Sequence, residues 1–218
     1  MVMDGPIRTP TDPVLTLAQW LSPGFPIGAF AYSSGLEQAI ADGVVTPATV
    51  EDWLSDMLRD GNGMVDAILI RVAAHAVNPI EVDQIARAVC PSRERLLEID
   101  AQGAAFCAQL RATWHVEATG LTYPVALGVG IRQLDLPLTL AVQMYLHAWV
   151  SAVVAACQRL MALGQTEAQR IVAALAPLCS DVARASKDKT LNDLTNQSFA
   201  ADIAAMRHET LSPRIFRT

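Results

Sequence analysis

The segment around which this chain is organised reads LSPGFPIGAFAYSSGLE and spans residues 21–37. Its prolines and glycines recur at short intervals and stop both helix and strand. Large apolar residues stand between them, namely Phe25, Ile27, Phe30 and Tyr32. The pattern predicts a shaped, ordered loop. Ser34 and Glu37 have the spacing of a capping box, so a helix capped by Ser34 is expected to follow directly.

An ordered apolar loop of this kind has two interpretations. It can pack beneath its own domain, with the serine serving only as a helix cap, or it can present its side chains to a binding partner. The residues of the loop do not decide between these interpretations.

Length and charge limit the classes of protein that need to be considered. With 218 residues the chain can bury roughly 70% of its unfolded surface in one core, so a single domain is expected. The formal net charge of −6 argues against a nucleic-acid-binding protein, because that function needs a clustered positive surface.

The cysteines and the N-terminal residues bear on the compartment. No CxxC pair occurs, and the cysteines stand among alanines and aliphatic residues at Cys90, Cys107, Cys157 and Cys179. This favours buried free thiols in a reducing compartment. Residues 1–10 contain an aspartate and two prolines and lack the apolar core of a signal peptide. The sequence therefore predicts a cytoplasmic protein.

A long uncharged segment lies between Asp135 and Arg159 and would suffice to cross a bilayer. It contains Pro137, Gln143 and His147, and much of its apolar character comes from alanine. No second candidate span exists, and the flanks lack a basic cluster. A central core helix that is apolar on all sides is the favoured interpretation, and a membrane-associated helical protein remains as an alternative.

Helical periodicity dominates the rest of the chain, and no run alternates for long enough to indicate a sheet. Gly128 and Gly130 are expected to allow close helix approach. Starts of helices are indicated at Asp12-Pro13, Thr46-Pro47, Asn78-Pro79, Pro91-Ser92, Thr122-Tyr123-Pro124, and Thr166 with Gln169 as a capping box. The prediction is an all-α fold, a single compact multi-helix domain of about ten helices around the uncharged helix.

Three parts of this domain are distinguished by composition. Residues 1–185 form the helical body, and residues 186–201 are polar and are expected to be a mobile linker. Residues 202–218 are predicted to form a short helix and a tail that binds a partner.

Several kinds of chemistry lack their usual motifs. No GxxxxGK[ST] loop is present, so the chain is not expected to be a P-loop GTPase. The histidines are scattered along the sequence, so there is little support for the hypothesis that this chain binds a metal ion. Residues 31–35, AYSSG, faintly resemble the GxSxG nucleophile motif, but that motif needs a strand before the turn. A small-molecule hydrolase therefore remains only as a second alternative.

Three blocks of sequence resemble the urease accessory protein UreF family. Residues 26–37 are similar to its signature P-[VI]-G-[AG]-F-[SA]-Y-S-x-G-L-E, and residues 163–169 are similar to L-G-Q-T-x-x-Q. Residues 202–218 are similar to the C-terminal segment of the family, which begins D-[IL]-x-[AS]-M-x-H-E and finishes R-[LI]-F-R-S. Residues 123–128 are a weaker match. The departures are Ser212, Pro213 and Thr218, where the family often has Tyr, Ser and Ser.

The resemblance implies a non-enzymatic helical protein of nickel-dependent urease maturation. Such a protein would bridge and regulate the GTPase UreG and the accessory protein UreH, also called UreD, and it would dimerise with a second copy. Coupled GTP hydrolysis would then deliver nickel to apo-urease. The chain itself is expected to bind no cofactor, since the complex handles nickel and GTP, and no contact with nucleic acid or membrane is expected.

The resemblance also assigns a partner interface. Its suspected members are Pro26, Gly28, Phe30, Tyr32, Ser33, Gly35, Glu37, Gly164, Gln165, Thr166, Gln169, Arg207, His208, Glu209, Arg214, Phe216 and Arg217. Tyr32, Ser33 and Glu37 are expected to face a partner, the GTPase, rather than to belong mainly to the core. The tail, residues 210–218, is expected to fray alone and to order on UreH binding. Arg214 would then bond to carbonyls or a carboxylate near the Tyr32 loop, which is the segment 21–37.

Overall fold

The computed structural model of the chain describes residues 12–218, so the expectation for residues 1–10 lies outside it. In the described residues there are ten α-helices, two 3₁₀ helices and no strand, which confirms the all-α, single-domain prediction. The α-helices are α1 (Pro13–Trp20), α2 (Leu36–Ala41), α3 (Val50–Asp60), α4 (Asn62–His75), α5 (Pro79–Ala88), α6 (Arg93–Trp114), α7 (Tyr123–Gln133), α8 (Leu138–Leu160), α9 (Gln165–Ala185) and α10 (Phe199–His208). The 3₁₀ helices are η1 (Ala29–Ala31) and η2 (Leu191–Asp193).

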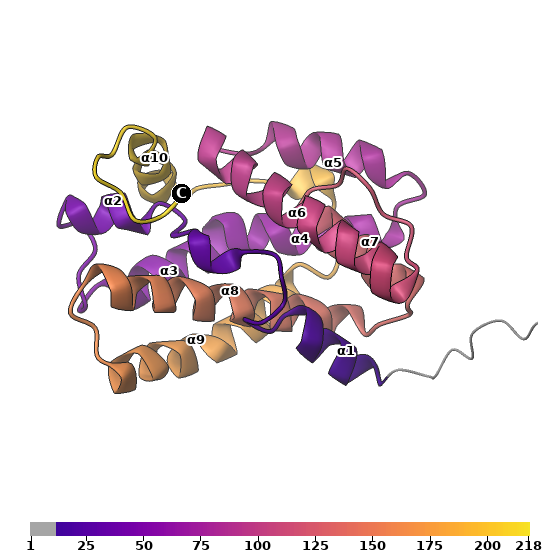
Figure 1. The fold of residues 1–218 in the computed structure, drawn as a ribbon, viewed down its shortest axis with the longest axis horizontal. Coiled ribbons are helices and arrows are strands. Elements are labelled where there is room, and N and C mark those ends of the chain that lie inside the picture. The colour runs from indigo at the N-terminus through magenta and orange to yellow at the C-terminus, as the bar shows by residue number, and fades with distance from the viewer. Residues whose placement is uncertain (1–11) are drawn as a thin grey trace, which may run out of the picture.

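The helices pack around α7, whose residues Tyr123 to Ile131 are all buried. α4 and α6 contact it, and α8 and α9 run side by side along the opposite edge of the molecule (Figure 1). α2 and α10 pack together at one end, where the chain also finishes (Figure 1). The first and last thirds of the sequence therefore meet at this end.

Gly128 lets α7 approach α4 closely, as expected from the sequence. A Cβ atom at this position would lie 2.4 Å from the carbonyl oxygen of Ile70 and 2.8 Å from the Cβ of Ala73. A Cβ atom at Gly130 would instead lie 3.0 Å from the indole ring of Trp20. The two glycines thus accommodate a helix backbone and an aromatic ring.

The uncharged segment forms α8, but this helix is not buried on all sides. Of the described helices, α8 alone is long and apolar enough to cross a membrane, and half of its most apolar 18-residue window is buried. His147 is exposed, and Gln143 and Ser151 are half-buried. The expectation of a helix buried on all sides is corrected. The helix packs mainly on α9 and α4, with smaller contacts to α1, α2, α7 and η1, and this leaves part of its surface exposed.

The segment 21–37 is ordered and has both buried and exposed apolar residues. Phe25 is buried, and its ring centroid lies 5.5 Å from that of Phe106 in α6. Tyr32 is buried as well, whereas the side chain of Phe30 is 73% exposed. The loop therefore packs on its own domain and also presents an aromatic side chain to solvent.

Local helix starts were predicted with mixed success. Asp12, Asn78 and Ser92 cap their helices through side-chain hydrogen bonds, as expected. The capping boxes at Ser34 and Thr166 were wrong, because α2 and α9 begin after the glycines Gly35 and Gly164, without a side-chain cap. Ser34 has a positive φ of 54°, outside the β region in which a serine N-cap typically lies.

Residues 186–201 are attached to the helical body. The N–H of Gln197 donates to the carbonyl of Asp60 at 2.7 Å, and the hydroxyl of Ser198 donates to the carbonyl of Asp56 at 3.2 Å. Both acceptors belong to α3. The mobility expected of this segment stays a prediction.

Candidate functional site

An ionic cluster, buried except for the exposed Arg214, joins α2, α6, α10 and the tail at the end where α2 and α10 meet. His208 is fully buried, with Nδ1 2.7 Å from Glu94 Oε2 and Nε2 3.0 Å from Glu37 Oε2. Glu94 also accepts from Arg214 at 2.7 Å. We call Glu37, Glu94, His208 and Arg214 the carboxylate clamp.

Glu37 holds the backbone of the tail as well as His208. Its carboxylate accepts from the N–H of Ile215 at 2.6 Å and from the N–H of Phe216 at 2.9 Å. Burial opposes ionisation of Glu37, but the hydrogen bonds from His208 and these amides outweigh it and hold the pKa of Glu37 below its ordinary value. A single carboxylate in α2 thus fixes both α10 and the tail.

The charges of the clamp balance when both ring nitrogens of His208 carry a proton. Glu37 and Glu94 lie on opposite sides of the ring, and each also accepts from a donor outside it. A ring that donates from both nitrogens is cationic. In that state, the two negative charges of Glu37 and Glu94 face the two positive charges of His208 and Arg214. Buried charges of this kind are tolerated because each one is paired.

The tail also pairs with the Tyr32 loop through its backbone. The N–H and the hydroxyl of Ser33 both donate to the carbonyl of Thr218, at 2.7 and 2.5 Å. The N–H of Arg217 donates to the carbonyl of Ala31 at 2.8 Å. Arg159 of α8 lies over the ring of Phe216, 4.2 Å from its centroid. Loop, tail and the end of α8 therefore form one packed unit.

A second buried ionic group, which we call the Arg95 network, lies beside the clamp. Arg95 is 2.5 Å from Asp66 Oδ2 and 3.1 Å from Glu98 Oε2. Tyr145 donates to Asp66 at 2.6 Å, and Gln102 donates to Glu98 at 3.3 Å. Burial raises the pKa of Glu98, because Arg95 is shared with Asp66 and does not fully compensate.

A large groove of about 790 Å³ opens between the Tyr32 loop and the half-exposed side of α8. Ile27 and Phe30 of the loop face Met144 and Trp149 of α8 across it. Its volume falls in the range of binding sites, and its lining is mainly apolar. The groove can accommodate apolar groups of a partner.

Within residues 12–218, no group of three or more His, Cys, Asp or Glu side chains is arranged to hold a metal ion. The acidic members of the clamp are instead engaged by His208, Arg214 and backbone amides.

Known sequences place the chain in a family. The sequence model of UreF matches residues 44–176. The chain is 47% identical to the urease accessory protein UreF of Roseobacter denitrificans, over 95% of each chain, and 46% identical to that of Ruegeria pomeroyi, over 97% of this chain and 100% of the relative. It is 50% identical to that of Ruegeria sp. strain TM1040, over 95% of this chain and 99% of the relative.

The chain belongs to the UreF family. The matched range 44–176 covers α3 to α8 and the first half of α9. Most of the clamp lies outside that range, but the alignments with the three relatives include 95–97% of the chain.

The structure corrects the placement of three suspected interface residues of this UreF-family chain. Tyr32, Ser33 and Glu37 are buried, with 5%, 0% and 6% of their surface exposed, and were wrongly expected to lie outside the core. Glu37 is directed inward because its partners are His208 and the amides of the tail. The interpretation of the loop as packing beneath its own domain holds for these residues.

The structure places the tail against the helical body of its own chain. Arg214 does bond to a carboxylate, Glu94, but within its own chain and without a partner protein. Phe216 is buried, so the tail packs on the UreF-family body. The fraying expected of the isolated tail, and its ordering on partner binding, stay predictions.

The remaining suspected residues divide into two groups. Gly35 is at the clamp, because a Cβ there would lie 2.8 Å from the backbone nitrogen of Ala205 in α10. Others, in the loop, in α10 and in the tail, are partly or fully exposed, namely Pro26, Gly28, Phe30, Arg207, Glu209 and Arg217. A separate exposed group lies at the start of α9, with no hydrogen bond to the clamp in the described structure, namely Gly164, Gln165, Thr166 and Gln169.

Sequence reasoning missed Glu94, the Arg95 network and the groove. Glu94 and Glu98 stand in α6 one turn apart, on the side that is buried. Charged residues at buried helical positions were a usable signal, because such charges are rarely buried without a partner.

Acid should release the clamp through Glu37. Its pKa is lowered in the folded protein, so its contribution to stability is present above its ordinary pKa of 4.5 and is lost as the pH falls through the folded value. We expect wild type to be more stable than Glu37→Gln at neutral pH, and the difference to shrink below about pH 4.5. Urea unfolding midpoints of both proteins, measured from about pH 7 to about pH 3, test this.

The exposed Glu51 of α3 supplies the control, since Glu51→Gln should show no such convergence with wild type. A stability difference between wild type and Glu37→Gln that stays constant over the whole pH range would contradict an ionised Glu37 in the clamp.

Proposed function

We propose that this UreF-family chain is a non-enzymatic accessory protein of urease maturation. The observation that carries the proposal is the similarity to proteins named urease accessory protein UreF, at 46–50% identity over 95–97% of the chain. The chain also spans 95–100% of those relatives. Similarity of this extent leaves no large region that could carry an unrelated function.

In its finer form, the proposal is that the chain bridges a UreG-type GTPase and a UreH/UreD-type protein, and regulates the GTPase. It acts in the cytoplasm, pairs with a second copy, and helps to deliver nickel to apo-urease without itself binding nickel or GTP. The apolar groove and the exposed side chains of Phe30 and Ile215, at 73% and 68%, support a role in protein contacts.

The two alternative functions find little support in the site. For a hydrolase, Ser33 would be the nucleophile, yet its hydroxyl is buried and donates to the carbonyl of Thr218. His208, which could act as a base, is held between two carboxylates instead. For a membrane protein, α8 is the candidate span, and half of its apolar window is buried against other helices.

We expect the isolated protein neither to bind nor to hydrolyse GTP, but to change the nucleotide cycle of the GTPase. Co-expression of the urease genes without this chain should yield urease with little nickel and little activity, and its return should restore both. Equilibrium dialysis with GTP, metal analysis of purified urease and single-turnover GTPase assays are the measurements.

Two variants sharpen the test. Phe30→Asp puts a charge on an exposed aromatic residue beside the groove, and should reduce capture of the partner proteins and urease activation. Val77→Asp makes the same change at a side chain that is 97% exposed between α4 and α5, and should leave both unchanged. Tight GTP binding by the isolated chain, or full urease activation in its absence, would refute the proposal.

A further inference from the structure

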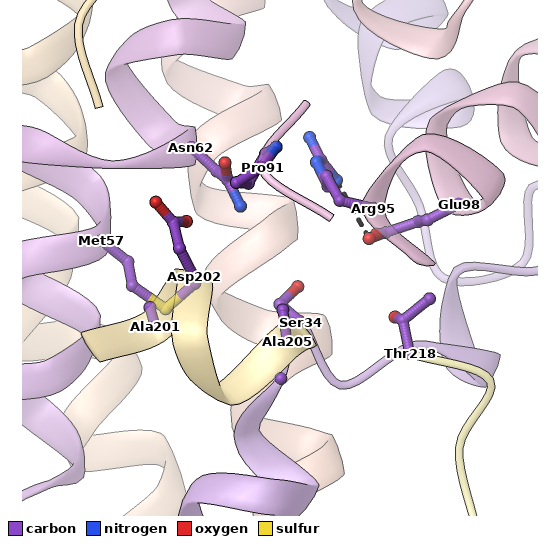
Figure 2. Close-up of a pocket in the computed structure, with 11 residues that line it drawn as sticks. Ser34, Met57, Asn62, Pro91, Arg95, Glu98, Ala201, Asp202, Ala205 and Thr218 are labelled. Atoms are coloured by element: carbon purple, nitrogen blue, oxygen red, sulfur yellow. Dashed lines mark ion pairs between the residues drawn. The ribbon is translucent and has the colours of Figure 1, made fainter. Parts of the chain in front are cut away.

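A small cavity of about 10 Å³ lies between the Tyr32 loop, α6, α10 and the last residue of the tail. Figure 2 shows Arg95, Glu98 and Thr218 on one side of it, Asp202 on the other, and Ser34 between them. Segments from both ends of the chain thus enclose it. Its volume is about that occupied by one water molecule.

Two buried oxygen atoms of residues lining this cavity have no hydrogen-bond partner among the described protein atoms. One is Oε2 of Glu98, which has an ionic contact of 3.1 Å with Arg95 but no aligned hydrogen bond. The other is Oγ1 of Thr218. Glu98 and Thr218 are only 4% and 2% exposed. An unsatisfied buried polar atom is costly, so Thr218 Oγ1 calls for a partner, and Glu98 Oε2 can accept a further hydrogen bond beside its ion pair with Arg95.

We propose that this cavity binds one ordered water molecule that hydrogen-bonds to Glu98 Oε2 and to Thr218 Oγ1. A buried water needs two to four polar partners, and the cavity offers these two oxygens with the polar side chains of Ser34, Asn62 and Asp202 around them. The water donates to the carboxyl oxygen of Glu98 and exchanges a hydrogen bond with the threonine hydroxyl.

Groups of both signs of charge line the cavity, namely Arg95, Glu98 and Asp202, so the occupant is selected by volume and not by charge. The volume excludes groups much larger than water.

The water connects two parts of the molecule that share no direct hydrogen bond. Thr218 belongs to the tail, and its carbonyl already accepts from Ser33. Glu98 belongs to the Arg95 network, which continues through Asp66 to Tyr145 of α8. A water between Glu98 and Thr218 therefore ties the tail to the helix that forms one wall of the groove.

A crystal structure of the full chain at high resolution tests the site directly. The expected result is a single density peak in the cavity, about 2.8 Å from Glu98 Oε2 and from Thr218 Oγ1. A cavity without density, or a protein group bonded to Glu98 Oε2 in its place, would overturn the proposal.

Hydrogen exchange in solution gives an independent test, because the Ser33 N–H reports attachment of the tail to the loop. Thr218→Val keeps the shape of the side chain but removes the hydroxyl. With the water in place, this change should speed exchange of the Ser33 amide about tenfold. Thr218→Ser keeps the hydroxyl and should stay within about threefold of wild type.

The direction in which Thr218→Val changes the exchange rate of the Ser33 amide tells whether the cavity holds the water. Without the water, Thr218→Val removes an unsatisfied buried hydroxyl, so exchange should slow or stay the same. Thr210→Val is the matched control, because it removes an exposed tail hydroxyl that bonds only to the carbonyl of Arg207. Should Thr218→Val fail to fold by circular dichroism, the crystallographic density decides.

Discussion

Replacing His208 with alanine should lower the free energy of unfolding by about 3–5 kcal/mol. The side chain is fully buried, and its loss leaves Glu37 and Glu94 facing one another across a cavity. Removal of one member of a buried ionic group is costly because the remaining charges stay desolvated. Urea unfolding followed by circular dichroism, at neutral pH and constant salt, measures the loss.

His75→Ala is the control for this change. His75 is exposed in the last turn of α4, so its replacement should alter stability by no more than about 0.5 kcal/mol. The amides of Ile215 and Phe216 should also exchange faster in His208→Ala, because Glu37 holds both. A loss of stability below about 1 kcal/mol would mean that the clamp is hydrated and does not carry the tail.

Gly128→Ala should destabilise the protein by about 2 kcal/mol, although alanine favours helix by about 1 kcal/mol over glycine. The added Cβ would lie 2.4 Å from the carbonyl oxygen of Ile70, which is fixed within α4. Relief requires α4 and α7 to separate, and these helices form the middle of the core. Thermal and urea unfolding report the change.

Gly164→Ala provides the comparison for this prediction. A Cβ at Gly164 meets no atom within 4 Å, and its φ of −70° suits any residue. Because Gly164 is the N-cap of α9 and alanine caps less well than glycine, the variant should lose no more than about 1 kcal/mol. If Gly128→Ala were as stable as wild type, the close approach of α4 and α7 would be adjustable, and the core would be less tightly packed than the structure indicates.

The fold was largely predictable because its signals are local. Proline after a capping residue placed the starts of α1 and α5 correctly. The start predicted at Thr46-Pro47 was wrong, because α3 begins at Val50, after Thr49. Helical periodicity without alternation excluded a sheet. The uncharged segment gave α8, but composition alone does not reveal which side of a helix will be packed.

The clamp could not be predicted, because its members are far apart in sequence. Glu37 looked like the third residue of a capping box with Ser34, and that local interpretation accounted for its position. Its actual partners, His208 and the tail amides, lie 171 or more residues away. A local sequence pattern does not distinguish a glutamate that bonds to the start of its own helix from one that bonds to another helix or to a distant segment.

The pairing of the Tyr32 loop with the tail sets an order of events during protein synthesis. Glu37 leaves the ribosome long before His208, since 171 residues separate them, and at about 5–20 residues per second this takes roughly 10–30 seconds. Throughout that interval α2 and the loop lack the groups that neutralise and anchor them. The nascent chain therefore displays the Tyr32 loop without its tail, and chaperones or partner proteins can reach a surface that the finished protein covers.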